Sequence, residues 1–291
     1  MQLAHRIWPP PAAVAALLVA VGVTTAATAG TLDRIGQEKA IRIAYREDAP
    51  PFSYKDKIGE PTGFMVDLCR AVAKKLAEQP NLSSLNVVYV PVTAQDRFEA
   101  ITQQKADLLC EPTSVTLSRR EQVDFSIPTF LDGASLMVRA DGSKNWTLRE
   151  LAGQKIGVLA GTTTEESLRN SLKDAGIIGD VVAIKTHDEG LAMLDEGKIS
   201  AYFADRSILL FLIKNSKAPD KLRLADDYLT VEPYALALPR GDADFRLAVD
   251  RALSHIYRSG EIVSIFRHTF GGKAEPSQIL RTLYVISGLP D

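Results

Sequence analysis

The chain is predicted to be an α/β protein in which parallel sheets are covered by helices, and two observations lead to this prediction. Short apolar segments typical of buried strands alternate with segments whose apolar residues recur at helical spacing. This alternation breaks near 132–133 (Asp-Gly) and then starts again. Because strand–helix–strand units build parallel sheets, two such runs predict two α/β lobes.

The first run predicts three strands with helices between them. Residues 41–45 (IRIAY) are predicted to be its first strand. The helix predicted at 64–79 places Leu68, Val72 and Leu76 four residues apart, on one face. The other elements follow in the order strand 86–90, helix 95–104 and strand 106–110.

The second run shows the same alternation of strands and helices. Its elements are a strand at 155–160, a helix at 162–173, a strand at 181–185, a helix at 187–196, a strand at 199–204 and a helix at 205–215. Short apolar runs at 129–137 and 231–239, each between turn residues, are predicted to cross between the lobes.

The C-terminal part of the chain is predicted to be helical at first. Residues 245–270 are predicted to form two helices divided near Ser259-Gly260. If these helices pack on the first lobe, that lobe is discontinuous in sequence. In the tail at 273–291, the stretch SQILRTLYVIS fits either a helix or an edge strand.

The first 29 residues are predicted to be a cleaved secretory signal. Arg6 precedes an apolar run at 12–23, and Ala-Thr-Ala at 27–29 supplies the small residues needed for cleavage. A membrane anchor is the alternative, but 12 residues are too few to cross about 30 Å of hydrocarbon. No cysteine follows the run, so we expect a mature protein without a lipid anchor, starting near Gly30 outside the cytoplasm.

Length and charge limit the classes of function. Without the predicted signal, 262 of the 291 residues remain, enough for two modest domains. The formal net charge moves from -2 to -3, because only Arg6 is lost. Such a nearly neutral chain argues against nucleic acid as a partner.

Cys69 and Cys110 are the two cysteines of the chain. In an exported protein such a pair suggests a disulfide, which would contribute roughly 4 kcal/mol in the chain-entropy model. The alternative is two separate buried thiols, on a predicted helix and at a strand end. Metal binding is not expected, because the cysteines are 41 residues apart and no histidine is near either.

Six stretches, in order along the chain, carry a resemblance to a known family. They are PPFSY (50–54), GFMVDL (63–68), TSVTLSRREQVDFS (113–126), AGTTTEESL (160–168), AYFAD (201–205) and SGEIVSIF (259–266). From about Leu32 to Gly271 the chain resembles the extracytoplasmic solute-binding proteins of polar amino-acid ABC transporters, family 3. Shorter stretches such as PVTAQDRF and KTHDEGLAMLDEG are similar to its glutamate/aspartate-binding branch.

The resemblance implies a two-lobed periplasmic-binding-protein fold (type II), with mainly parallel sheets flanked by helices. Its expected parts are lobe 1 at 30–130 and 236–272, lobe 2 at 134–232, a hinge at 131–133 and 233–235, and a C-terminal extension at 273–291. It also implies a periplasmic monomer without a cofactor. Such a protein closes on one amino acid and passes it to an inner-membrane ABC permease.

The resemblance also implies which residues bind the ligand's α-carboxylate. Arg119 corresponds to the family arginine, whose guanidinium can pair with a carboxylate through two parallel hydrogen bonds. Ser114 corresponds to a position that meets the same carboxylate. The alternative for Arg119 is a solvated surface charge beside Arg120.

Two junctions of the second lobe complete the expected site. Gly161 allows close approach of the backbone, and free N–H groups at Thr162 and Thr163 would attract the carboxylate at a helix start. Asp205 corresponds to the family aspartate that accepts the α-ammonium. At both junctions the alternative is a simple helix cap.

Three donors are expected to contact a second carboxylate on the ligand side chain. Arg46, Arg97 and His187 correspond to an arginine pair and a histidine of the glutamate/aspartate branch. The alternatives are local pairing of each arginine with a neighbouring acid, and a cap or surface role for His187. Phe52 is expected either to pack on the ligand's methylenes or to belong to the core.

Three positions depart from the family pattern. Pro112 stands where relatives usually have Gly or Ser, and it removes one backbone donor. Ala94 replaces a hydroxyl residue of the closest branch, and Met65 replaces an acid found in many relatives. These departures concern the identity of the ligand more than its class.

Other functions compete with an acidic amino-acid receptor. One is a receptor for another polar amino acid, and another is a sensor domain. An enzyme on the same scaffold, similar to cyclohexadienyl dehydratase, would need a positioned acid or base such as Glu47, Glu111 or His187. No nucleophile–base spacing or metal triad supports an enzyme.

Overall fold

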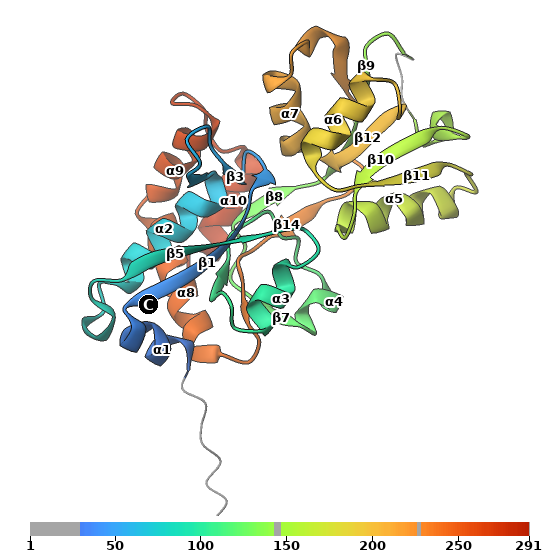
Figure 1. The fold of residues 1–291 in the computed structure, drawn as a ribbon. Helices are drawn as coiled ribbons and strands as arrows, with labels where there is room; N and C mark the ends of the chain where they lie inside the picture. The colour runs from blue at the N-terminus through green and yellow to red at the C-terminus, as the bar shows by residue number, and fades with distance from the viewer. Residues whose placement is uncertain (1–29, 143–146, 226–227, 291) are drawn as a thin grey trace, which may run out of the picture.

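Two five-stranded sheets, each flanked by helices, form two lobes (Figure 1). The computed structural model describes residues 30–142, 147–225 and 228–290, so the predicted signal at 1–29 lies outside the described residues. The prediction of a two-lobed α/β fold is confirmed.

The first sheet contains strands from both ends of the chain. Its strands are β1 (Ala40–Arg46), β5 (Asn86–Val92), β6 (Leu108–Leu109), β7 (Val123–Phe125) and β15 (Ala237–Pro239). The order is β5-β1-β6-β15-β7, with β1 parallel to β5 and β6, and β15 antiparallel to β6 and β7. Because β15 follows the second lobe in sequence, the first lobe is built from two separate stretches.

The second sheet has the same plan. Its strands are β9 (Ala134–Arg139), β10 (Lys155–Leu159), β11 (Asp180–Ile184), β12 (Ala201–Asp205) and β13 (Leu222–Leu224). The order is β11-β10-β12-β9-β13, in which β10 is parallel to β11 and β12, and β9 is antiparallel to β12 and β13. In each sheet one strand therefore runs against the other four: β15 in the first and β9 in the second.

The two crossings between the lobes pair with each other. Strands β8 (Phe130–Asp132) and β14 (Glu232–Tyr234) form an antiparallel pair, drawn between the lobes in Figure 1. Gly133 follows β8, and a Cβ at this position would overlap the backbone carbonyl of Thr230. The close approach of the two crossing segments thus requires glycine here.

Helices cover both lobes. Those of the first lobe are α1 (Thr31–Glu38), α2 (Phe64–Leu76), α3 (Arg97–Thr102), α4 (Leu117–Arg120), α8 (Ala243–Arg258), α9 (Glu261–Phe270) and α10 (Gln278–Ser287). Those of the second lobe are α5 (Thr163–Asp174), α6 (His187–Asp195) and α7 (Arg206–Asn215). Short 3-10 turns lie at η1 (Pro80–Leu82), η2 (Leu148–Leu151) and η3 (Pro219–Lys221), and a small sheet contains β2 (Asp48–Ala49), β3 (Ser53–Lys55) and β4 (Pro61–Thr62).

Neighbouring residues of the first sheet belong to two different apolar clusters, because their side chains point to opposite faces. Ile43 and Leu108 join the large cluster under α2 and α8, while the next residues, Ala44 and Leu109, join a smaller cluster with α3. Both faces of the sheet are therefore buried, as a parallel sheet requires. Among the described residues, no helix is both long and apolar enough to cross a bilayer.

Several predicted boundaries shift by one to three residues, and one open alternative is resolved. The helix predicted from 95 begins at Arg97, because the Asp96 carboxylate accepts a hydrogen bond from the Thr93 backbone N–H (2.6 Å) and closes a turn first. The helix predicted to 79 ends at Leu76. The tail forms a helix, α10, whose Tyr284 ring lies 4.9 Å from that of Tyr257 on α8.

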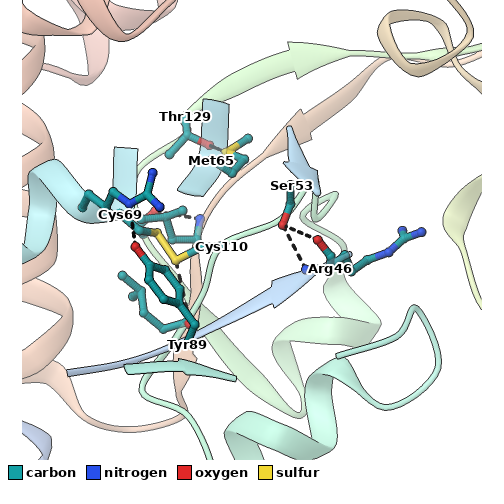
Figure 2. The surroundings of a disulfide bond; sticks show 11 residues. Arg46, Ser53, Met65, Cys69, Tyr89, Cys110 and Thr129 are labelled. Carbon is teal, nitrogen blue, oxygen red and sulfur yellow. Dashed lines mark hydrogen bonds between the residues drawn. A yellow bond between two sulfur atoms is a disulfide. The ribbon is translucent and has the colours of Figure 1, made fainter. Parts of the chain in front are cut away.

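Cys69 and Cys110 form a disulfide, as predicted (Figure 2). The bond joins α2 to the residue after β6, and both side chains are fully buried. It therefore ties α2, a covering helix of the first lobe, to the carboxyl end of the central strand β6, from which the chain continues to Glu111.

Removing this disulfide is expected to destabilise the first lobe. The bond closes a sequence separation of 41 residues, so Cys69→Ala/Cys110→Ala should lower the free energy of unfolding by about 4 kcal/mol in the chain-entropy model. Chemical denaturation of oxidised wild type and the double variant would measure this. An unchanged midpoint and slope would contradict the expectation.

Candidate ligand-binding site

A small cavity lies between the lobes, and most of the residues predicted to bind a ligand line it. Those that do are Arg46, Arg97, Ser114, Arg119, Thr162, Thr163, His187 and Asp205. Its free volume is about 20 Å³, which is room for roughly one water molecule. A larger ligand therefore requires the lobes to separate or these side chains to move.

Two predicted residues lie elsewhere. Phe52 is fully buried in an aromatic cluster, with its ring 4.9 Å from that of Phe130 and 5.5 Å from that of Tyr234. Of the two roles considered for Phe52, this structure shows a core position and no contact with the cavity. Gly161 lies beside the cavity, with its carbonyl accepting a hydrogen bond from Arg97 (3.2 Å).

Polar contacts join the two lobes around the cavity. The Gln95 side-chain amide donates to the Ala160 carbonyl (3.0 Å), and the Ser114 and Thr163 hydroxyls lie 3.1 Å apart. Together with the bond from Arg97 to Gly161, these contacts hold the lobes in a closed arrangement.

Arg119 lines the cavity and forms no ion pair with a carboxylate of the described residues. Thr116 caps α4 by accepting a bond from the Arg119 N–H (3.2 Å), and this fixes the backbone. The guanidinium donates to the Ser114 carbonyl (2.7 Å) and lies 5.3 Å from the centre of the Phe98 ring, but among the described residues no carboxylate forms an ion pair with it. Burial lowers the pKa of Arg119, so an anion in the cavity would stabilise its charge.

The turn before α5 presents hydroxyl groups. The Thr162 hydroxyl accepts a bond from the Glu165 N–H (3.2 Å), so Thr162 is the N-cap that the alternative describes. The Gly161 N–H is also engaged, donating to the Glu165 carboxylate (3.0 Å). The Thr162 hydroxyl and the Gly161 N–H thus already have partners within the second lobe. The Thr163 hydroxyl instead lies next to Ser114 of the first lobe.

Asp205 ends β12 and precedes α7. Its carboxylate makes no capping bond to α7, and it accepts a hydrogen bond from the Thr164 hydroxyl (3.0 Å). Burial raises the pKa of the Asp205 carboxyl to about 7, and the nearby carboxylates of Glu232 and Asp132 add to the shift. The structure therefore does not show the simple cap, and a cation here would favour the ionised form.

Glu232, on β14, is a residue of this site that the sequence analysis did not identify. Its carboxylate accepts hydrogen bonds from Ser114, from Thr163 (2.6 Å) and from Thr230 (2.9 Å). It thus links a hydroxyl of each lobe to a crossing segment. An acid standing directly before a proline in an otherwise apolar crossing is the signal that could have indicated it.

The three predicted side-chain donors line the same cavity. Arg46 donates through two nitrogens to the Asp48 carboxylate (2.9 and 2.7 Å), as its local alternative proposed. Arg97 does not pair with Asp96, and its Nε lies 3.3 Å from the Glu111 carboxylate instead. Figure 2 shows the Arg46 side chain pointing away from the disulfide, with Ser53 bonded to its backbone.

His187 is buried and neutral. Its Nδ1 lies 2.7 Å from the Tyr202 hydroxyl, while its Nε2 has no hydrogen-bond partner among the described residues. Burial, with a further contribution from Arg46, lowers the pKa of His187 well below its usual value. Burial similarly lowers the pKa of Arg97 to about 10. No cluster of potential metal ligands occurs among the described residues.

Comparison with known proteins gives matches over most of the chain. A sequence profile of the bacterial extracellular solute-binding proteins, family 3, matches residues 41–272. The L-glutamate/L-aspartate-binding protein of Pseudomonas aeruginosa is 32% identical over 89% of this chain and 85% of its own. The L-cystine-binding protein TcyJ of Escherichia coli is 25% identical over 88% of this chain and 92% of its own.

A solved structure of an amino acid-binding protein also has the same fold as this chain. An ancestral amino acid-binding protein, AncCDT-1, described as a precursor of cyclohexadienyl dehydratase, matches with a TM-score of 0.73 and 26% identity. The match covers 82% of this chain and 99% of the ancestral protein. The two-lobed arrangement is thus shared with an amino acid-binding protein.

The stability of the ligand-free protein is expected to fall as the pH rises. The pKa is raised to about 7 for Asp205 and about 6 for Asp132, mainly by burial. The native state therefore holds protons that the unfolded chain releases. The stability that they contribute is fully present below about pH 4 and is lost as the pH rises to about 7.

Denaturant titrations from pH 4 to pH 8 would measure this loss. Asp205→Asn should remove much of the slope, while Asp174→Asn, at an exposed position of α5, should keep it. A stability that rises across this range in wild type would contradict the expectation.

Proposed function

The chain belongs to family 3 of the bacterial extracellular solute-binding proteins, and on this basis we propose that it captures one amino acid between its lobes for an ABC importer. The family profile spans both lobes, from residue 41 to residue 272. Relatives of the chain are named for the amino acids they bind. The proposal therefore concerns which residues bind the ligand and which ligand is bound.

The observation that carries the proposal is a cation and an acid on facing lobes, neither of which forms an ion pair among the described residues. Arg119, on α4, has no carboxylate partner among the described residues, and Asp205, at the end of β12, has no cation partner there. An amino acid brings an α-carboxylate and an α-ammonium, so it would compensate both. We assign the α-carboxylate to Arg119, Ser114 and Thr163, and the α-ammonium to Asp205, with Glu232 beside it.

Closure would follow from contacts that only the closed state makes. The segments at 131–133 and 233–235 act as the hinge, and the lobes at 30–130 with 236–272 and at 134–232 move about it. A ligand held by Arg119 on one lobe and Asp205 on the other stabilises the closed state over the open one. The bonds already seen between the lobes would reinforce this state.

We propose glutamate or aspartate as the ligand. Arg46, Arg97 and His187 converge where a ligand side chain would extend, and each can donate hydrogen bonds to a second carboxylate. A relative at 32% identity is named for these two amino acids. Another polar amino acid is the alternative, since a relative named for cystine also matches.

The predicted signal at 1–29 would place the protein in the periplasm, consistent with the extracellular location in the family description. There it would act as a monomer without a cofactor and dock on an inner-membrane permease. We propose binding without catalysis, because both named relatives are binding proteins. Turnover of a cyclic dienyl acid would instead favour the dehydratase alternative.

Replacing Arg119 should abolish binding. Arg119→Ala removes the cation assigned to the α-carboxylate, so affinity for L-glutamate should fall about a hundredfold or more. Arg120→Ala is the matched control, because Arg120 follows Arg119 in α4 and is exposed. Calorimetric titration against the twenty amino acids would measure both.

The same titrations test the acidic ligand. Arg46→Ala should weaken glutamate and aspartate more than neutral amino acids. Equal binding of neutral amino acids by wild type and Arg46→Ala, with no preference for acids in either, would refute this assignment.

A further inference from the structure

Glu111 brings a carboxylate of the protein itself into the side-chain end of the cavity. It follows β6 and is 1% exposed. One carboxylate oxygen lies 3.3 Å from Arg97 Nε, and the other lies 3.8 Å from Arg46 Nη1. The Thr113 hydroxyl also donates to it. The carboxylate thus lies between the two arginines assigned to the ligand's side chain.

This position changes the charge balance of the cavity. Arg46 already has the carboxylates of Asp48 and Glu111, and Arg97 has that of Glu111. The neighbouring His187 is neutral, so it adds no positive charge. Arg119, by contrast, has no carboxylate partner among the described residues. Among the described residues, Glu111 thus forms ion pairs with Arg97 and Arg46, while Arg119 forms none.

We propose that Glu111 is the specificity-determining residue of the side-chain end, where it occupies the position of a ligand's second carboxylate. An acidic ligand must displace Glu111 from Arg97, because two carboxylates held together in a buried site repel each other. A neutral amide side chain meets no such repulsion. Glu111 therefore lowers affinity for acidic amino acids relative to their amides. This inference rests on the proposed function of the cavity.

The test is a selectivity ratio measured by calorimetry at fixed pH and salt. The affinities for L-glutamate and L-glutamine are determined for wild type, for Glu111→Gln, which keeps the shape without the charge, and for Glu111→Ala, which also opens space. The ratio of glutamate to glutamine affinity should rise about tenfold or more in both variants. Glu99→Gln, an exposed position on α3 of the same lobe, is the matched control and should leave the ratio unchanged.

Two further measurements extend the test, and the second covers the case in which the variants fold poorly. If the variants fold, saturating glutamate should raise their melting temperature more than it raises that of wild type, because it restores a carboxylate beside Arg97. A crystal structure of wild type with L-glutamate needs no variant. It should show Glu111 moved away from Arg97 and the ligand's side-chain carboxylate in its place.

The outcomes separate this inference from the proposed function. An unchanged or lower ratio in the Glu111 variants, or a glutamate complex in which Glu111 keeps its contact with Arg97, would overturn the role of Glu111 alone. Folded wild type and variants that bind no amino acid at all would overturn the proposed function.

Discussion

Charge compensation in a dry crevice is the constraint on which this structure depends. A buried charge without a partner costs several kcal/mol, so each ionised group between the lobes needs a counter-charge or several hydrogen bonds. Arg46 and Arg97 meet this need through Asp48 and Glu111, and Glu232 meets it through three hydroxyl groups. Among the described residues Arg119 and Asp205 form no ion pair, and the proposed function assigns them to the two charged groups of an amino acid.

The fold places these groups together because of where its strands end. Arg46 closes β1, Glu111 follows β6 and Asp205 closes β12. The carboxyl ends of parallel strands meet at one edge of a sheet, and open α/β sheets bind ligands at that edge. In this protein the two sheets turn these edges toward each other, so short polar segments from distant parts of the chain form one cavity.

The sequence predicted the features that depend on local pattern. The alternation of strands and helices, the two crossings and the disulfide were all predicted, and the residues named for the ligand lie mostly around one cavity. Glu232 was missed and Glu111 was considered only as a catalytic group, because their partners lie far away in sequence or on other elements. The periodicity of apolar residues indicates helices and strands, but it does not indicate which distant side chains pair with each other. The tail allowed two structures because its apolar residues suit either, and packing against Tyr257 on α8 accompanies the helix.

The disulfide gains importance from its neighbour in the chain. Cys110 directly precedes Glu111, so the covalent link to α2 anchors the backbone from which that carboxylate projects. Under the role proposed for Glu111, ligand preference would then depend on whether this bond is intact. In protein whose Cys69–Cys110 bond is reduced, Glu111 is held by non-covalent contacts alone, so ligand profiles should be compared only between samples of the same thiol content.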